Sequence, residues 1–190
     1  MRTTWRWPRD HDESDLIVSE MDEVIPALVA AVQEQHATGD HYRDDAIRQA
    51  MEHQAQLALR PGPVRVDVIV DPPWSDGQIN SVQVVTGDRP FLVDTVASCL
   101  LRHGWRVEDV RHPIIGVKRD RGTIEAVGMP GRGGCASESW IHIDATAPLG
   151  TDIGQAAEQL RDDLCACLDQ VACATDDWGA MHEAMLRTAE

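Results

Sequence analysis

Residues Ser81 to Gly104 read SVQVVTGDRPFLVDTVASCLLRHG, and the spacing of their apolar side chains changes in the middle. The first six residues, 81–86, have the β-branched composition of a strand. After the turn Gly87-Asp88-Arg89-Pro90, apolar residues recur at three- and four-residue steps, which predicts an amphipathic helix with proline in its first turn. Gly104 stands where a left-handed residue would end that helix. A strand, a tight turn and a short helix therefore form the predicted centre of the fold.

The segments on both sides continue this alternation of strands and helices. The expected elements are, in chain order, helices at 24–32 and 44–59, a strand at 64–70, the strand and helix just described, strands at 105–118 (bent at Pro113 or Gly116), 123–129 and 139–144, and a long helix from a cap at Thr151. The dipeptide Arg121-Gly122 after Asp120 signals a hairpin. This order predicts an α+β fold in which helices lie on one face of a mainly antiparallel sheet.

The acidic residues gather toward the two ends of the chain. The 190 residues include 17 Lys and Arg against 32 Asp and Glu, a net charge of −15, and the segment from 60 to 145 is nearly neutral. We expect an acidic helical N-terminal flank over 1–60, an α+β domain over 61–174, and a C-terminal helix over 175–190.

Composition excludes several classes of function. The acidic charge disfavours nucleic acid, whose binding depends on basic clusters. No apolar stretch approaches the ~20 residues that span a bilayer, so no membrane partner is expected. Five cysteines without framework spacing indicate reduced thiols and a cytoplasmic location.

The candidate cofactor and metal motifs lack the surrounding structure that such sites require. Residues 131–136 match the dinucleotide pattern G-x-G-x-x-A, yet a strand is expected after them, where that fingerprint requires a helix. Cys165 and Cys167 are two apart on a helix and point about 200° away from each other, so they cannot share an ion. Cys135 is expected to be a loop cysteine. We predict no metal, NAD or other cofactor site in this chain.

Two histidines on strands leave alternatives open. With Asp109 or Asp144, His112 and His142 could form a metal or acid–base pair if their strands were neighbours. Otherwise they occupy the sheet face opposite the helices. Trp140 is two residues from His142 and shares its face, so Trp140, His142 and His112 would mark a candidate interaction face for a partner.

Residues 82–96 resemble the strand, turn and helix of an ACT-type regulatory domain. More closely, they resemble the N-terminal region of the large bacterial NAD-specific glutamate dehydrogenases. Three further pieces follow in that family's order: 111–115, 138–143, and Asp176-Asp177-Trp178 with Met181. The resemblance covers about Ala58 to Glu190, is strongest over 82–145, and implies an ACT-like (ferredoxin-like) fold for 61–174.

The resemblance also implies a function. The whole enzyme would convert L-glutamate and NAD to 2-oxoglutarate, ammonia and NADH in a catalytic region far downstream, and this chain would be a non-catalytic regulatory or assembly module. NAD would bind the parent enzyme, not this chain. The partners would be the rest of the dehydrogenase polypeptide or a second copy docked through the sheet. Lys118, the single lysine, lacks the glycine-rich setting of the active site.

In other ACT domains the corresponding turn binds amino-acid effectors, so Asp88, Arg89, Pro90, Phe91 and Leu92 form a candidate effector-binding turn. The typical pattern is D-R-P-G-L, and here Phe91 replaces the glycine. We expect its ring to pack into the apolar core or a partner and to block the ligand. Two rival functions remain: a free-standing ACT-type amino-acid sensor, and a small enzyme that uses His112 or His142 with a carboxylate.

Overall fold

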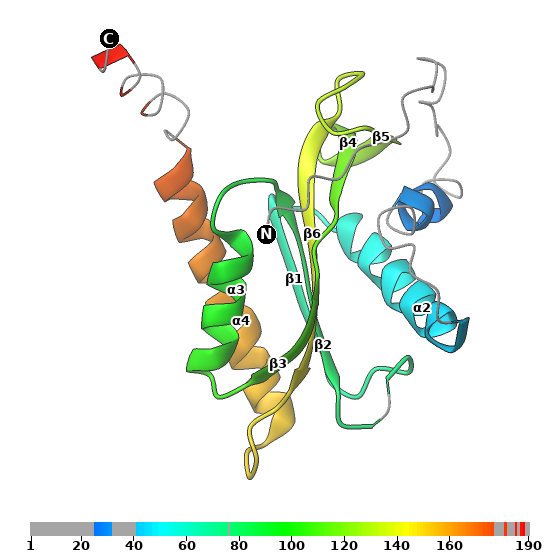
Figure 1. Ribbon diagram of the computed structural model, residues 1–190, viewed down its shortest axis with the longest axis vertical. Coiled ribbons are helices and arrows are strands. Elements are labelled where there is room, and N and C mark those ends of the chain that lie inside the picture. The colour runs from blue at the N-terminus through cyan, green and yellow to red at the C-terminus, as the bar shows by residue number, and fades with distance from the viewer. Residues whose placement is uncertain are drawn as a thin grey trace.

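The computed structural model describes residues 25–31, 41–75, 77–176, 181, 185, 187 and 188. The elements are α2 (His41–Ala58), β1 (Val64–Ile69), β2 (Asn80–Gly87), α3 (Leu92–Arg102), β3 (Arg106–Arg111), β4 (Ile114–Asp120), β5 (Thr123–Gly128), β6 (Ala136–Thr146) and α4 (Ile153–Thr175). Residues 25–31 are also helical. Figure 1 shows one sheet between two layers of helices.

The six strands form one antiparallel sheet in the order β1-β2-β6-β4-β5, with β3 paired to β6. β6 is the longest strand: its first half pairs with β4 and its second half with β3. The break between β3 and β4 falls at Pro113, which confirms the predicted bend. Proline has no N–H for a sheet ladder, but its carbonyl accepts a hydrogen bond from the Trp140 N–H at 3.0 Å. β3 is bonded to β6 alone among the described strands.

The helices α3 and α4 cover one face of the sheet. Their apolar stripes pack against β1, β2 and β6 and bury Trp105 almost completely. The core members that share this face are Val66, Val68, Val82, Val84, Leu92, Val96, Cys99, Leu100, Trp105, Ile141, Ile143, Ala145, Ala157, Leu160, Leu164 and Leu168. Burial of these side chains is the main stabilising contribution to the predicted α+β unit.

The opposite face is covered by α2 and the helical segment 25–31, so the expectation that helices lie on one face alone is wrong. Trp140 is 0% exposed and His142 4% exposed beneath these helices. Small residues of α2, such as Ala55, permit a close approach, and Gln54 Nε2 donates to the carbonyl oxygen of Ile141 at 2.9 Å. The α+β class and the antiparallel sheet are confirmed, but the face that carries Trp140 and His142 is interior.

Local signals explain where several elements begin and end. The hairpin between β4 and β5 turns at Arg121 and Gly122, both with positive φ (47° and 90°), as a type I′ turn requires. Gly104 follows α3 at φ 75°, as predicted. α4 is capped by Asp152, whose side chain accepts from the Gln155 N–H, one residue after the predicted Thr151 cap.

Some expectations are not tested by these elements. The proposed domain limits at 60 and 174 stay predictions. Most of the C-terminal helix expected over 175–190 lies outside the described residues, as do both ends of the helix expected at 24–32. Every helix in the part of the chain that the structure describes is too short or too polar to span a bilayer.

Candidate functional site

The turn between β2 and α3 lies where the amino-acid site was expected. The Asp88 N–H donates to the Ser137 carbonyl at 2.8 Å, which fixes the start of the turn against β6. α3 then begins at Leu92, two residues after Pro90, where the sequence predicted the start of the helix. Phe91 is the N-cap residue, and its side chain makes no capping hydrogen bond.

Phe91 adopts the left-handed conformation that glycine would adopt without cost. Its φ is 70°, a region that costs a residue with a Cβ roughly 1–2 kcal/mol. The ring is 57% exposed, so the expectation that it packs into the apolar core is wrong for this chain. The chain reverses at Phe91, and the next residue, Leu92, is the first to enter the core, at 2% exposure.

Asp88 is joined to Ser139 and His112 by a short chain of hydrogen bonds. Ser139 Oγ donates to Asp88 Oδ1 at 2.6 Å, and His112 Nε2 lies 2.9 Å from the same Oγ. The hydroxyl has one proton and gives it to the carboxylate, so His112 must donate to the serine oxygen. Burial lowers the pKa of His112, although the Asp88 charge opposes this.

This order of donors does not activate a nucleophile. A catalytic serine gives its proton to an imidazole that acts as base, whereas here the imidazole gives its proton to the serine. Ser139 is also 0% exposed, so no substrate reaches its oxygen. The cluster is suited to holding the turn against β6, and it provides no support for a small enzyme built on His112.

Arg89 links the turn to the far end of α4. Its Nη1 donates to Asp176 Oδ1 at 3.0 Å and to Thr175 Oγ1 at 3.4 Å. A cation at the carboxyl end of a helix is favourable, because the last carbonyl groups carry partial negative charge. The guanidinium of the turn is therefore engaged inside the domain.

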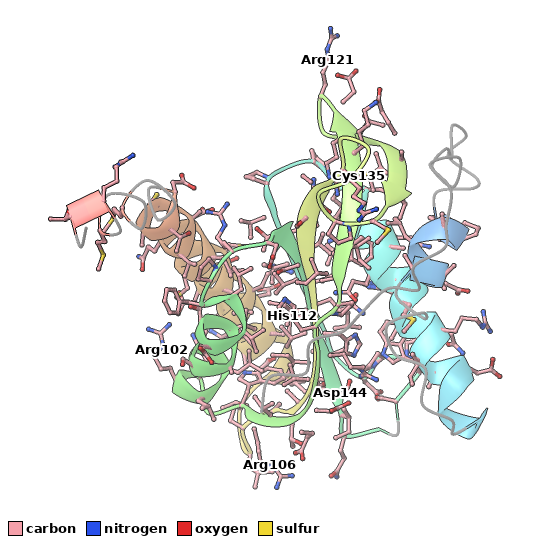
Figure 2. The ribbon with its side chains drawn as sticks, turned by 45° about the horizontal axis from the view of Figure 1, so that its top comes forward. Arg102, Arg106, His112, Arg121, Cys135 and Asp144 are labelled. Atoms are coloured by element: carbon pink, nitrogen blue, oxygen red, sulfur yellow. The ribbon has the colours of Figure 1, made fainter. Side chains whose placement is uncertain are left out.

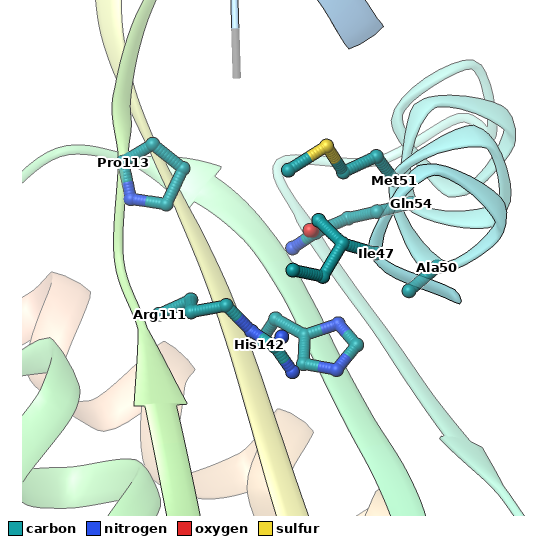
Figure 3. Close-up of a pocket in the computed structure, with 7 residues that line it drawn as sticks. All are labelled: Ile47, Ala50, Met51, Gln54, Arg111, Pro113 and His142. Atoms are coloured by element: carbon teal, nitrogen blue, oxygen red, sulfur yellow. The ribbon is translucent and has the colours of Figure 1, made fainter. Parts of the chain in front are cut away.

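A second polar cluster lies beneath α2, around His142 (Figure 3). A cavity of about 10 Å³ is lined by Ile47, Ala50, Met51, Gln54, Arg111, Pro113 and His142. A space of this size holds at most one water molecule. This cluster is thus a packed polar interior with no room for a substrate.

The hydrogen bonds fix the protonation of His142. Its Nε2 lies 3.0 Å from Asp144 Oδ1, and its Nδ1 lies 3.2 Å from Gln83 Nε2, which can only donate. Nδ1 of His142 must therefore accept, and the proton sits on Nε2. The partners of His142 are themselves bonded: Gln83 Oε1 lies 2.9 Å from His53 Nδ1, and Arg111 Nη2 donates to Asp144 Oδ2 at 2.5 Å.

The electrostatics agree with that arrangement. Burial lowers the pKa of His142 despite its hydrogen bond to Asp144, so the ring is neutral near pH 7. Burial alone would raise the pKa of Asp144, but the hydrogen bond from His142 and the charge of Arg111 lower it overall. A neutral imidazole and an ionised carboxylate are thus stable side by side. Figure 2 shows Asp144 on the sheet, with His112 separate from it.

The sequence matches one family of known domains. The matching family is described as the ACT1 domain of glutamate dehydrogenase, and the match spans residues 27–164, from the helical segment 25–31 into α4. The chain belongs to this family. No curated protein matches the chain. The ACT-like fold expected from residues 82–96 is confirmed, and the match begins some thirty residues before the resemblance expected from Ala58.

The two histidines of this ACT1 domain do not form one site. Ser139 and His142 are three residues apart on β6 and point to opposite faces of the sheet. His112 bonds Ser139, so it lies on the face opposite to His142. His142 does meet Asp144, as one of the alternatives required, but its ring is buried under α2 and the carboxylate is partly buried. The candidate interaction face of Trp140, His142 and His112 is therefore not a surface.

The remaining motifs of the ACT1 domain are in plain structural roles. The glycine-rich segment 131–134 leads directly into β6, a strand, as expected. Cys135 is buried, and burial raises the pKa of its thiol. Among the described residues, no group of three or more His, Cys, Asp or Glu side chains could hold a metal. The absence of an NAD site stays a prediction.

The site contains residues that sequence reasoning missed. Ser139 and Thr175 partner the turn, and Gln83 and Ser81 partner His142. Ser81 and Gln83 alternate with valines on β2, a pattern that is typical of an antiparallel strand with one polar, solvated face, so it gave no signal that they are interior partners of His142. Ser139 gave no signal either, because its partner Asp88 is distant in sequence.

Proposed function

We propose that this ACT1 domain is a non-catalytic assembly and regulatory module of a large NAD-dependent glutamate dehydrogenase. The rest of the polypeptide would oxidise L-glutamate with NAD to 2-oxoglutarate, ammonia and NADH. Family membership supports the regulatory role in glutamate dehydrogenase. The observation that carries the assembly role is that the effector turn is closed by contacts within the chain.

The charged side chains of the turn that could hold an amino acid are bonded within the chain, although Arg89 Nε is buried without a hydrogen-bond partner. Pro90 has no N–H to offer a carboxylate. Asp88 accepts from Ser139, and Arg89 donates to Asp176. Phe91 adds a side chain where a glycine would leave the backbone open. An effector would have to displace these partners, which costs about as much as the new hydrogen bonds would gain.

An amino-acid sensor is the second candidate, and one observation favours it. The first turn of α3 has no side-chain cap, so its N–H groups suit a carboxylate, and the exposed Asp88 next to it suits an ammonium group. A free amino acid carries both charges at the required separation. This candidate predicts saturable binding, whereas the assembly role predicts none.

Calorimetric titration of the full chain separates the two. We expect flat titrations with millimolar glutamate, aspartate, serine and branched-chain amino acids. Phe91→Gly is the matched variant, because it introduces the D-R-P-G-L pattern that is typical of other ACT domains. Saturable heat with the unmodified chain, lost in Asp88→Asn, would overturn the assembly role and support the sensor.

The assembly role also requires a partner surface other than the sheet. The face that carries Trp140 is covered by α2, so a second copy or the rest of the polypeptide would contact helices or strand edges. A test for catalysis completes the proposal. The chain alone should produce no NADH absorbance from glutamate and NAD, and NADH formation by the pure chain would contradict the non-catalytic role.

A further inference from the structure

The helices α3 and α4 run antiparallel (Figure 1), and polar contacts join α4 to both ends of α3. Arg89, before α3, meets Asp176 after α4, while His103 Nε2 after α3 lies 2.8 Å from Asp163 Oδ2. Between these two contacts the apolar cluster contains Cys99 of α3 and, packed against it, Cys165 and Cys167 of α4. The two helices are thus held in a fixed register around these thiols.

The thiols of Cys99 and Cys167 lie opposite each other in the seam between α3 and α4. Cys99 precedes His103 by four residues on α3, and Cys167 follows Asp163 by four residues on the antiparallel α4, so both cysteines lie about one helical turn from the His103–Asp163 contact. Arg102 of α3 reaches across the seam, and its Nη2 donates to Cys167 Sγ at 3.1 Å. Cys99 is fully buried, whereas Cys167 is partly exposed and Arg102 lies at the surface. Solvent therefore reaches the pair from the side of Cys167.

This asymmetry gives the two sulfurs different reactivities. Cys167 is partly exposed and lies beside the Arg102 guanidinium, which is the accessible, electropositive setting of thiols that react with oxidants. Cys99 has no access to solvent, and burial raises the pKa of its thiol, so it stays protonated until a neighbour reacts. An exposed attacking sulfur next to a buried resolving thiol is the usual arrangement of a redox-sensing pair.

We propose that Cys99 and Cys167 form a reversible disulfide between α3 and α4 when the domain meets a peroxide. The Cys167 thiolate attacks one peroxide oxygen, the O–O bond breaks, and the sulfur becomes a sulfenic acid while hydroxide leaves. The Cys99 sulfur then attacks that sulfenic sulfur, the S–O bond breaks, and the leaving oxygen departs as water with the Cys99 proton. In sum, two thiols and one hydrogen peroxide give one disulfide and two waters.

The bridge would act on the helices that flank the effector turn. α3 begins at that turn, and α4 ends at the partners of Arg89, so a covalent link holds both elements to one arrangement. A disulfide also restricts the unfolded chain. This property needs no effector and no catalytic residue, so it goes beyond the proposed function.

The experiment oxidises the full chain with hydrogen peroxide in a Cys165→Ser/Cys173→Ser background. Trypsin then gives one peptide, 66–102, in which Cys99 is the sole cysteine, and another, 162–187, in which Cys167 is the remaining one. We expect a crosslinked pair of these peptides, two hydrogens lighter than their sum, which a dithiol separates. The oxidised chain should melt about 5–10 °C higher than the reduced chain.

Variants at the seam test the chemistry. Arg102→Gln should slow the reaction with peroxide about tenfold, and Arg102→Lys should restore part of the rate because it keeps a positive charge. Cys167→Ser removes a partly exposed thiol, keeps the fold, and should abolish every crosslink to Cys99. The proposal is overturned if peroxide oxidises Cys167 without linking it to Cys99, or if Cys99 still crosslinks in Cys167→Ser.

Discussion

The imidazole of His142 and the carboxylate of Asp144 lie two residues apart on β6, with Nε2 and Oδ1 separated by 3.0 Å. The ring is buried under α2, the carboxylate is partly buried, and its second oxygen accepts from Arg111. The neutral ring has a single N–H, and it donates to the ionised carboxylate of Asp144. Protonation of this ring would place a second positive charge beside Arg111, on a side chain that is 4% exposed and can gain little hydration.

The stability of the domain should therefore fall in mild acid. The pKa of His142 is lower in the folded chain than its ordinary value near 6.5, so the unfolded chain binds protons first as the pH falls. From about pH 6.5 downward, the free energy of unfolding should drop by up to about 1.4 kcal/mol per pH unit for this histidine. His112, whose pKa is also lowered, acts in the same direction.

The surroundings of His142 define the window and the controls. Asp144, Asp109 and Arg111 face the ring from β6 and β3, and His53 of α2 reaches it through Gln83. The lowered pKa of Asp144 means that its own contribution is lost only below about pH 4. Urea unfolding between pH 7.5 and 5 therefore reports the histidines.

Two variants separate titration from packing at this site. His142→Gln should reduce the pH dependence of the free energy of unfolding by up to about 1.4 kcal/mol per pH unit, which corresponds to one proton. Ser81→Ala removes a hydroxyl 3.2 Å from the ring, so it should lower stability by about 1 kcal/mol at every pH without changing the slope. An unchanged slope in His142→Gln would contradict the prediction.

At position 91 the backbone should matter more than the ring. Phe91→Gly and Phe91→Ala both remove the exposed ring, but alanine keeps the cost of φ 70° that glycine does not have. Phe91→Gly should unfold with a free energy about 1 kcal/mol higher than Phe91→Ala. Thermal or urea denaturation measures this difference, and equal stability of the two variants would show that the turn relaxes out of the left-handed region.

No side chain fits at Gly116, where β4 pairs with the end of β5. A Cβ there would lie 2.3 Å from the Gly128 carbonyl oxygen and 2.4 Å from the Met129 carbonyl carbon. These backbone atoms cannot move away without disrupting the pairing of β4 with β5. Gly116→Ala should cost several kcal/mol or prevent folding. Gly87→Ala is the matched control, because its nearest neighbour is the end of the flexible Arg89 side chain at 3.8 Å. Similar melting temperatures for the two variants would argue against this close packing.

The ion pair of Arg119 and Glu138 should be essential because a third charge lies beside it. Arg119 binds both carboxylate oxygens, at 2.6 and 3.0 Å. Arg65 is close by, and burial together with the charge of Arg119 lowers the pKa of its guanidinium. Glu138→Gln would leave two cations facing each other with no anion between them. We expect a loss of about 3 kcal/mol in urea unfolding.

A surface pair on the same hairpin is the control for that result. Lys118 and Glu125 are 2.9 Å apart and half exposed, so water and salt already screen them. Glu125→Gln should leave the urea midpoint unchanged. If Glu138→Gln also left the urea midpoint unchanged, the buried pair would not stabilise the hairpin.

Local sequence signals predicted the elements of this fold well, because each depends on neighbours in the chain. The strand, turn and helix of residues 81–104, the type I′ hairpin at Arg121-Gly122 and the bend at Pro113 follow from backbone preferences that need no tertiary information. The ends of elements were less accurate. α3 begins at Leu92 because a left-handed Phe91 precedes it, and a side chain at that conformation is disfavoured by any local rule.

The covered face could not be predicted in the same way. Trp140 and His142 alternate on β6 in a pattern that fits an exposed polar face as well as a buried one. Only the packing of α2, more than eighty residues earlier in the sequence, makes them interior. The partners of Asp88 and Arg89 are also distant in sequence, at 139 and 175–176, and hydrogen bonds of that kind leave no periodic trace.

The position of β3 has a consequence for association between molecules. A strand edge with unpaired N–H and C=O groups is a template on which a strand from another protein can form, and such growth ends in aggregates. β3 presents Arg106, Glu108, Asp109 and Arg111, and its register shifts between Val107 and Asp109. A foreign strand would have to bury charges of both signs against an irregular ladder, so the sheet resists extension from this side and the domain can stay at high concentration without polymerising through it.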